Sequence, residues 1–146
     1  MADRTRLAEL NAEVTAFFRA LEALRARNAE SLGLAATEYR ALARVVEAGE
    51  LTPKLLSISM GMSTGAITSV TDSLVARGLL ERVANPVDRR SVMLIATDLG
   101  RSAIESSFSA YHAVIAGAVG ESSDDAVRDL TDLLSRITHT IAAPQP

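Results

Sequence analysis

The stretch of sequence that decides the fold runs from residue 52 to residue 97 and reads TPKLLSISMGMSTGAITSVTDSLVARGLLERVANPVDRRSVMLIAT. It opens with Thr52 and Pro53, which together form a helix start signal. Threonine can cap the exposed N–H groups of a first turn, and proline suits the first helical position because it has no N–H to satisfy. We therefore expect a helix that continues to about Ser59.

A second helix follows after a turn that contains glycine. Gly61 interrupts the first helix, and Ser63 can cap the next one, which continues to Arg77 and ends at Gly78. Two helices joined by a glycine-containing turn of about three to four residues have the spacing of a helix-turn-helix. This spacing predicts a unit that reads DNA.

The second helix has an apolar side and a polar side. The apolar residues recur at helical spacing and should face the core: Ile67, Val70, Leu74 and Val75. The polar side carries short side chains, which near a helix N-terminus can approach phosphates and base edges closely. The candidate DNA-contact residues of this helix are Ser63, Thr64, Gly65, Thr68, Ser69 and Ser73. The alternative interpretation of this side is an ordinary solvated helix face.

A hairpin with a basic tip comes next. Two β-rich runs, 79–83 and 91–95, flank a turn that begins at Asn85. The candidate DNA-contact residues at the tip of this wing are Asp88, Arg89 and Arg90. Arginine on such a tip suits a narrow minor groove, where the negative potential is strongest, and we expect Asp88 to hold the guanidinium of Arg90 in one orientation.

Several short motifs stand in a fixed order along the chain: Thr52-Pro53, then Met62-Ser63-Thr64-Gly65-Ala66-Ile67-Thr68, then Arg77-Gly78-Leu79-Leu80, then Asp88-Arg89-Arg90, then Thr97-Asp98-Leu99-Gly100. In order and spacing they resemble the MarR family of winged-helix transcription regulators, most densely over residues 51–101. The resemblance implies a homodimer that binds double-stranded DNA at a pseudo-palindromic operator. It also implies that the protein is usually a repressor, released by a small-molecule effector or by thiol oxidation.

The distribution of charge supports a DNA-binding lobe, although the net charge of −3 by itself disfavours a nucleic-acid partner. Residues 52–101 contain six basic and four acidic side chains, so six minus four gives +2, and the rest of the chain carries −5. The family commonly has basic residues at two recognition-helix positions where this chain has Ser69 and Ser73. The recognition helix of this chain is therefore basic only at Arg77.

Length and composition favour one mainly helical domain. The chain has 146 residues, of which 48% are hydrophobic and only 3% aromatic. We expect a mainly α fold with a small β wing, a single domain over residues 1–146. In it, residues 35–97 form the winged helix-turn-helix lobe, and residues 1–34 and 98–146 form dimerisation helices.

The chain has no cysteine, which excludes disulfides and the thiol-based switch. It has no long apolar run and no apolar N-terminal signal, so we expect a cytoplasmic protein without a membrane segment.

The first and last helices should pair with a partner chain. In both of them apolar residues recur every three or four positions, which is the pattern of a helix–helix seam. The candidate dimer-interface residues are Leu7, Leu10, Val14, Phe17, Leu130, Leu134 and Ile137. The alternative for the first helix is an intramolecular core helix.

The helices between these ends should form the scaffold of the lobe. Thr37 can cap a helix that ends at Gly49, and Thr97 can cap another that continues to about Val119. The residues expected in the core are Tyr39, Leu42, Val45, Val46, Leu51, Leu55 and Leu56. Tyr39 has a second interpretation, as a residue that lines a ligand crevice.

No catalytic residue, metal site or cofactor is predicted. His112 and His139 lie in different predicted helices without ligand spacing, and no nucleophile motif or phosphate-binding loop occurs. The leading hypothesis is a dimeric sequence-specific DNA-binding transcription regulator, a repressor relieved by a small-molecule ligand. The alternative is a winged-helix dimer that does not bind DNA and acts as a protein-interaction or ligand-binding module.

Overall fold

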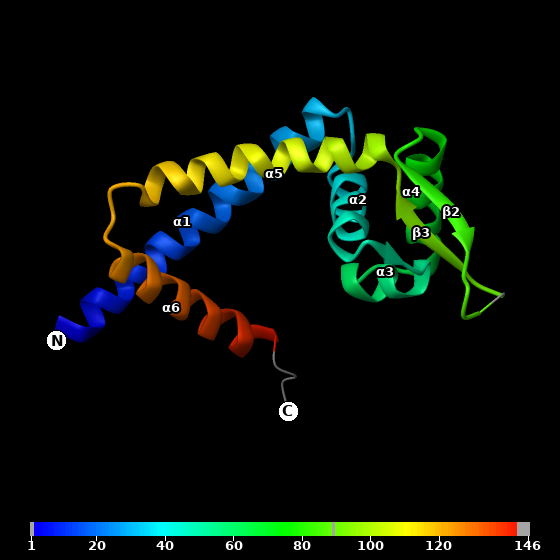
Figure 1. Ribbon diagram of the computed structural model, residues 1–146. Helices are drawn as coiled ribbons and strands as arrows, with labels where there is room; N and C mark the ends of the chain where they lie inside the picture. The colour runs from blue at the N-terminus through cyan, green and yellow to red at the C-terminus, as the bar shows by residue number, and fades with distance from the viewer. Residues whose placement is uncertain (1, 89, 143–146) are drawn as a thin grey trace. The chain divides into compact units, whose positions relative to one another are not determined.

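The computed structural model describes residues 2–88 and 90–142, and these are mainly helical with a small antiparallel wing (Figure 1). The chain forms two compact units, Met1–Ser107 and Phe108–Pro146. The predicted fold class is confirmed. In chain order the elements are α1 (Ala2–Ser31), α2 (Ala36–Ala48), β1 (Glu50–Leu51), α3 (Pro53–Met60), α4 (Thr64–Ala76), β2 (Leu80–Ala84), β3 (Val92–Ala96), α5 (Asp98–Val119) and α6 (Asp124–Ala142).

The wing is part of a three-stranded sheet with the order β1-β3-β2, in which both pairings are antiparallel. Strands β2 and β3 form the predicted hairpin, with Leu80 opposite Ala96 and Ala84 opposite Val92. The two-residue strand β1 was not predicted, because a run that short has no alternation to recognise. It pairs Leu51 with Leu94 and so joins the start of the helix-turn-helix to the wing.

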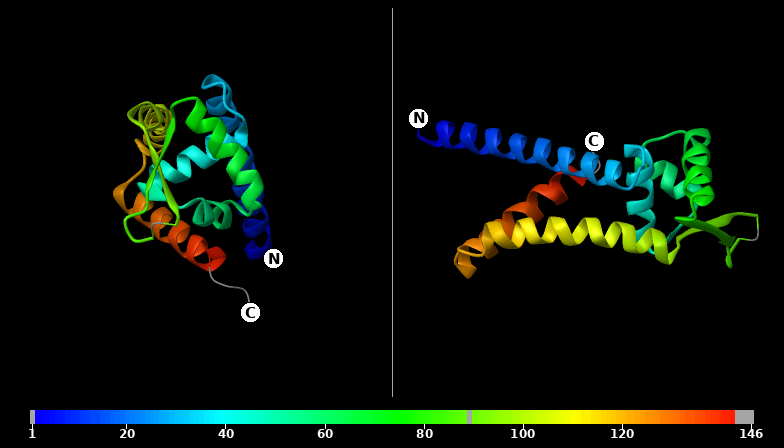
Figure 2. Two further views of the ribbon diagram at one scale, coloured as in Figure 1. Left: turned by 90° about the vertical axis from the view of Figure 1, so that its right-hand side faces the viewer. Right: turned by 90° about the horizontal axis from the view of Figure 1, so that it is seen from above.

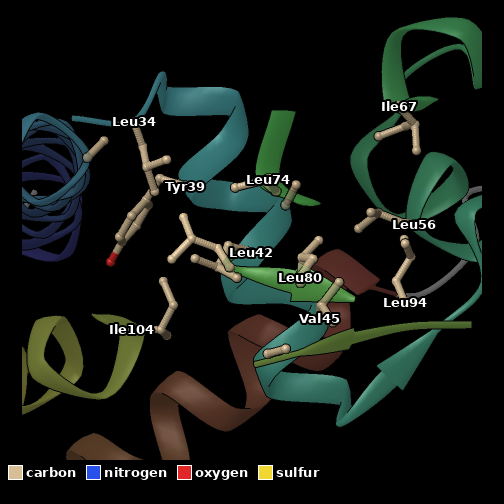
Figure 3. Packing of buried hydrophobic residues seen from close by; sticks show 14 residues of the cluster. Leu34, Tyr39, Leu42, Val45, Leu56, Ile67, Leu74, Leu80, Leu94 and Ile104 are labelled. Atoms are coloured by element: carbon tan, nitrogen blue, oxygen red, sulfur yellow. The ribbon is translucent and has the colours of Figure 1, made fainter. Parts of the chain in front are cut away.

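The core of the first unit lies between α2, the helix-turn-helix and the sheet (Figure 3). Leu42 and Val45 of α2 are fully buried, as are Leu56 of α3, Leu74 of α4 and Leu94 of β3. The fully buried set also contains Ala41, Ile67, Thr71 and Ile104. Apolar side chains from helices and strands thus share one core, and its burial supplies the main force that assembles the lobe.

The predicted core is confirmed except at one residue of α3. Tyr39 is buried in the core, which settles its two interpretations in favour of packing, while Val46 and Leu51 are partly buried against it. The prediction for Leu55 was wrong, because 52% of this residue is exposed. Consecutive residues of an α-helix differ by about 100° around its axis, so the burial of Leu56 turns Leu55 towards solvent.

Three of the four predicted helix caps are confirmed. Thr52 Oγ1 accepts a hydrogen bond from Leu55 N at 3.2 Å, Ser63 Oγ accepts one from Ala66 N at 3.3 Å, and Thr97 Oγ1 accepts one from Gly100 N at 3.0 Å. The predicted cap at Thr37 was wrong, since α2 begins one residue before it, at Ala36. The N–H group at that end is bound instead by Glu38, whose Oε2 accepts from Ala35 N at 2.8 Å.

Helix α1 is attached to the rest of its unit near its C-terminal end, and its N-terminal turns extend away from α2 (Figure 2). Ala29 near its end and Leu34 just after it are buried, whereas no residue from 4 to 27 is fully buried. Within its own unit, α1 is therefore fully buried only near its C-terminal end.

The first turn of α5 lies directly against the end of the helix-turn-helix. Thr97 Oγ1 donates to Gly78 O at 2.7 Å, and Thr97 N donates to Leu79 O at 3.2 Å. A Cβ atom added to Gly100 would lie 2.1 Å from Leu79 O and 3.2 Å from Leu42 Cδ1. Only glycine lets the backbone of α5 come this close to its neighbour.

We expect Gly100→Ala to destabilise the fold by about 1–3 kcal/mol, because the methyl group overlaps a backbone oxygen that cannot rotate away. Gly65→Ala is the matched control, since Gly65 is also helical but has nothing within 4 Å of an added Cβ. It should stabilise the fold by up to about 1 kcal/mol through helix propensity. Urea denaturation of both variants provides the measurement, and equal effects would contradict the close packing of α5.

Candidate nucleic-acid interface

Helix α4, the predicted recognition helix, presents a polar surface at its N-terminal end. It buries Ile67, Thr71 and Leu74 towards α2 and α3. On the other side the exposed residues are Ser63, Thr64, Gly65, Thr68 and Ser69, all of which the sequence nominated. The N-terminal end of a helix carries unsatisfied N–H groups and a partial positive charge, which favour a phosphate or a base acceptor.

The hydroxyl groups on this surface are partly engaged within the helix. Ser63 Oγ accepts the capping bond from Ala66 N, and Thr68 Oγ1 donates to Thr64 O at 2.9 Å. The hydroxyl proton of Ser63 can still be donated, and the oxygen of Thr68 can still accept. The exposed groups are therefore short hydroxyls and threonine methyls, which can touch base edges only if the helix backbone comes close to the groove.

Ser73 does not share this surface, which corrects the assignment made from the sequence. Its hydroxyl donates a hydrogen bond to Glu38 Oε1, and the residue is only partly exposed. It lies on the side of α4 that faces α2, because its hydroxyl reaches the carboxylate of Glu38 on α2. Periodicity had placed it on the polar side, but a polar residue next to the buried stripe can bond inward.

Arg77, the one basic residue of the recognition helix, is also bound within the fold. Its Nη1 donates to Gly33 O at 2.8 Å, and its Nη2 donates to Leu32 O at 3.1 Å. The same guanidinium lies 4.0 Å from the carboxylate of Glu38. Both terminal nitrogens of Arg77 thus bind carbonyl groups of the turn after α1. Helix α4 therefore has no long basic side chain that is unbound.

Two more basic residues counted in the charge of the lobe are used internally. Arg82 of β2 contacts Asp72 of α4 at 2.6 Å and donates to the buried hydroxyl of Thr71 at 2.8 Å. Arg101 donates to Ala96 O at 3.1 Å and lies 3.6 Å from Asp98. Arg82 thereby fixes the strand to the recognition helix. The formal charge of the lobe therefore overstates the number of basic side chains that remain free to contact DNA.

The wing loop is ordered by a set of hydrogen bonds centred on Asn85. Its Oδ1 accepts from Val87 N at 2.9 Å and from Asp88 N at 3.3 Å, while its Nδ2 donates to Ser91 Oγ at 2.8 Å. Ser91 N donates to Asp88 O at 3.0 Å, which closes the turn. The sequence signalled a turn at Asn85, but not that its side chain would bind both arms of the loop.

Asp88 acts on the backbone and not on the guanidinium of Arg90, contrary to the prediction. Its Oδ1 accepts a hydrogen bond from Arg90 N at 3.0 Å, and no ion pair joins the two residues. The predicted contact residue Arg89 lies outside the described residues. Arg90 is exposed, and Val87 beside it is 93% exposed. The carboxylate therefore shapes the turn that presents Arg90 and leaves its side chain available to a ligand.

The lobe described above can be compared with known proteins. Residues 34–92 match the MarR family. Over its winged helix-turn-helix lobe the chain is therefore similar to the MarR family. The multiple antibiotic resistance protein MarR of Salmonella typhimurium is 34% identical over 74 residues, a match that covers 51% of this chain and 51% of that protein. The chain thus spans about half the length of curated MarR-family relatives such as this one.

Two solved structures extend the likeness over nearly the whole chain. A MarR family protein from Bacillus stearothermophilus has a TM-score of 0.82 at 21% identity, covering 98% of this chain and 99% of that one. FabT of Streptococcus pneumoniae, solved in complex with DNA, has a TM-score of 0.76 at 20% identity, covering 92% of this chain and 96% of that one. At these identities the likeness establishes a shared MarR fold.

Residues 2–88 and 90–142 contain neither a metal site nor a membrane-spanning helix. No group of three or more histidine, cysteine or acidic side chains there is arranged to hold a metal ion. None of the helices in this part of the chain combines the length and the apolarity that crossing a membrane needs.

Glu38 should make the stability of the lobe depend on pH. The hydrogen bond from Ser73, then that from Ala35 N, and then the charge of Arg77 lower its pKa below the ordinary value of 4.5, although burial opposes this. A carboxylate with a lowered pKa contributes stability above its unfolded-state value, and this contribution is lost as the pH falls through the folded-state value.

We therefore expect acidification from about pH 5 to about pH 3 to destabilise the wild type more than Glu38→Gln. The measurement is the urea midpoint at each pH. Glu47→Gln is the matched control, because Glu47 lies in the same helix but is exposed and reaches only Arg44. If Glu38→Gln and Glu47→Gln showed the same pH dependence, the Glu38 network would contribute nothing to folding.

Proposed function

We propose that this chain is a dimeric, sequence-specific DNA-binding transcription regulator, a repressor that a small-molecule effector releases from its operator. The observation that carries the proposal is the pairing of two exposed elements in the MarR fold. The N-terminal end of α4 offers exposed hydroxyls and a helix terminus, and the hydrogen-bonded wing presents Arg90. FabT, which shares this fold, is seen in complex with DNA.

The side chains on α4 limit how bases can be read. The commonest specific contacts are those of arginine or lysine with guanine and of asparagine or glutamine with adenine, and the exposed face of α4 has none of these. Threonine methyls can contact the thymine methyl, and Arg90 suits a narrow A·T-rich minor groove. The proposed operator is therefore A·T-rich, and its recognition depends on DNA shape and on the spacing of its half-sites.

Homodimerisation is supported by apolar rows on α1 and α6 that their own units leave uncovered. On α1, Leu7, Leu10 and Phe17 are exposed, and Val14 is partly buried. On α6, the exposed residues are Leu130, Leu134 and Ile137. Exposed apolar side chains at helical spacing favour a helix–helix interface, because burying them removes their surface from water. A second copy would also supply the two-fold symmetry that a pseudo-palindromic operator needs.

The remaining parts of the proposal follow from the similarity to the MarR family. A dimer of this kind acts in the cytoplasm, without a catalytic step, a metal or a cofactor. Residues 35–97 serve as the DNA-binding lobe, and residues 1–34 and 98–146 serve as the dimerisation part of one domain. Without cysteine, the release signal is a small molecule and not thiol oxidation.

The second candidate function is a winged-helix dimer that does not bind DNA. It is favoured by one specific observation, that Arg77, Arg82 and Arg101 are all bound within the fold. The other basic residues in the described part of the lobe are Arg40, Arg44, Lys54 and Arg90, all of them exposed, and Arg44 pairs with Glu47. A lobe with fewer arginines free to contact phosphates binds DNA more weakly, so the measured affinity for DNA separates the two functions.

The test is a titration of the protein against a labelled DNA duplex taken from upstream of its own gene, at two salt concentrations. A random duplex of the same length is the control for non-specific binding. We expect tighter binding to the upstream duplex and a shallow salt dependence, because few phosphates are contacted. Equal affinity for both duplexes would overturn sequence-specific recognition and favour the second candidate.

Two substitutions of Asp88 test whether the wing acts through its shape. Both Asp88→Asn and Asp88→Ala remove the negative charge, but only asparagine keeps an oxygen that can accept from Arg90 N. We expect Asp88→Asn to bind DNA at least as tightly as the wild type, and Asp88→Ala to bind about two- to tenfold more weakly than Asp88→Asn. The measurement is the same titration. Equal gains in affinity would mean that Asp88 matters only through its charge.

The dimer can be tested by light scattering. The full chain should have the mass of a dimer at micromolar concentration, and Leu134→Asp should shift it to the monomer, because a buried unpaired charge is costly. Leu55→Asp is the matched control, since Leu55 and Leu134 are both 52% exposed but Leu55 lies on α3. A monomer mass for the wild type, or equal effects of the two substitutions, would overturn the proposed interface.

A further inference from the structure

Three helices of the first unit meet at one cluster of polar side chains. Helix α1 ends shortly before Gly33, α2 carries Glu38 in its first turn, and α4 ends at Ala76, just before Arg77. The guanidinium of Arg77 donates to both Leu32 O and Gly33 O, at 3.1 Å and 2.8 Å. Charge-assisted bonds from both arms of an arginine fix orientation as well as distance.

Glu38 completes the cluster from the side of α2. One carboxylate oxygen accepts from Ala35 N and lies 4.0 Å from Arg77, and the other accepts from the hydroxyl of Ser73. Its side chain is only 15% exposed. Hydrogen bonds to a poorly solvated carboxylate are costly to leave unmade, so the three helix ends are held in one arrangement.

The cluster contributes much of the contact between α1 and the rest of its unit, because α1 has few other buried contacts there. No residue from 4 to 27 is fully buried, and the buried apolar residues at this end are Ala29 and Leu34. Gly33 has φ of +61°, and a Cβ atom there would lie 3.4 Å from Arg77 Nη2, so the arginine lies close against the turn. The direction of α1 relative to α4 therefore depends strongly on Arg77.

We propose that Arg77 is a positioning residue that does not contact DNA, and that with Glu38 and Ser73 it sets the half-site spacing that the dimer reads. The inference rests on the proposed function, in which α1 takes part in dimerisation and α4 reads DNA. The two copies of α4 must lie about one helical turn apart, roughly 34–36 Å, to enter successive major grooves. A change in the angle between α1 and α4 moves both copies at once, and so changes which spacing fits.

The DNA experiment compares Arg77→Lys, Arg77→Ala and Arg90→Ala by titration against the upstream duplex at several salt concentrations. Lysine keeps the charge but has no planar fork, so both Arg77 variants should bind about tenfold more weakly with an unchanged salt slope.

Arg90→Ala should lower the slope by about one for each half-site. Duplexes with a few base pairs added between the half-sites should lose less affinity with Arg77→Lys than with the wild type.

Two outcomes of the titration would overturn the proposal. If Arg77→Ala lowers the salt slope and Arg77→Lys restores both slope and affinity, Arg77 contacts a phosphate. If Arg77→Lys binds every duplex as the wild type does, the cluster does not set the spacing. Arg44→Lys is the matched control, because Arg44 makes an exposed ion pair with Glu47 on α2 and should change nothing.

Measurements without DNA separate failure of this inference from failure of the proposed function. Because the chain has no cysteine, Ser69→Cys places one spin label on each α4. The distance between the two labels should be narrowly distributed in the wild-type background and broader or shifted with Arg77→Lys. Amide hydrogen exchange of residues 29–38, which needs neither DNA nor a dimer, should be faster with Arg77→Lys than with Arg44→Lys. An unchanged distance together with unchanged exchange would overturn the positioning role even if DNA binding were absent.

Discussion

The carboxylate of Glu38 is the contact on which the arrangement of this lobe depends. It binds the first N–H at the start of α2, the hydroxyl of Ser73 on α4 and, through charge, the guanidinium of Arg77. Apolar burial around Leu42 and Val45 supplies most of the energy of folding, but it is not directional. The polar cluster adds direction, because hydrogen bonds to a charged group restrict angles as well as distances.

This use of polar groups changes how the charge of the protein should be understood. The lobe from residue 52 to residue 101 has a formal charge of +2, yet Arg77, Arg82 and Arg101 all bind partners inside the fold. An arginine whose guanidinium is bound within the fold still contributes to the long-range potential, but it has fewer N–H groups to offer to a phosphate. In the proposed complex, attraction to DNA and contact with DNA therefore come from different residues of this chain.

An interaction could be predicted from the sequence when its two residues lie close together along the chain. The caps at Thr52, Ser63 and Thr97 were predicted correctly, because a capping side chain binds an N–H only three residues ahead. The hairpin was also predicted, since both of its strands adjoin one turn. Buried faces followed from helical periodicity, with Leu55 as the exception.

The interactions that the sequence did not reveal join distant residues. Ser73 binds Glu38 across 35 positions and Arg77 binds Gly33 across 44, so no local pattern marks them. Strand β1 exists only because β3 lies beside it. For the same reason the DNA-contact roles of Ser73 and of the Asp88 carboxylate were the parts of the candidate site that needed correction. Composition had shown which groups were present but not which were already bound.

The wing shows how a chain with little free positive charge can still present an effective contact. A loop that is mobile before binding loses conformational entropy when it is ordered against DNA, and this loss weakens the complex. In this wing Asn85, Asp88 and Ser91 already satisfy the backbone around the tip. The turn that carries Arg90 is therefore ordered in advance, so that mainly its own side chain remains to be fixed. Under the proposed function, preorganisation of the wing and a recognition helix fixed through Glu38 and Arg77 let geometry contribute the affinity that basic side chains on α4 would otherwise supply.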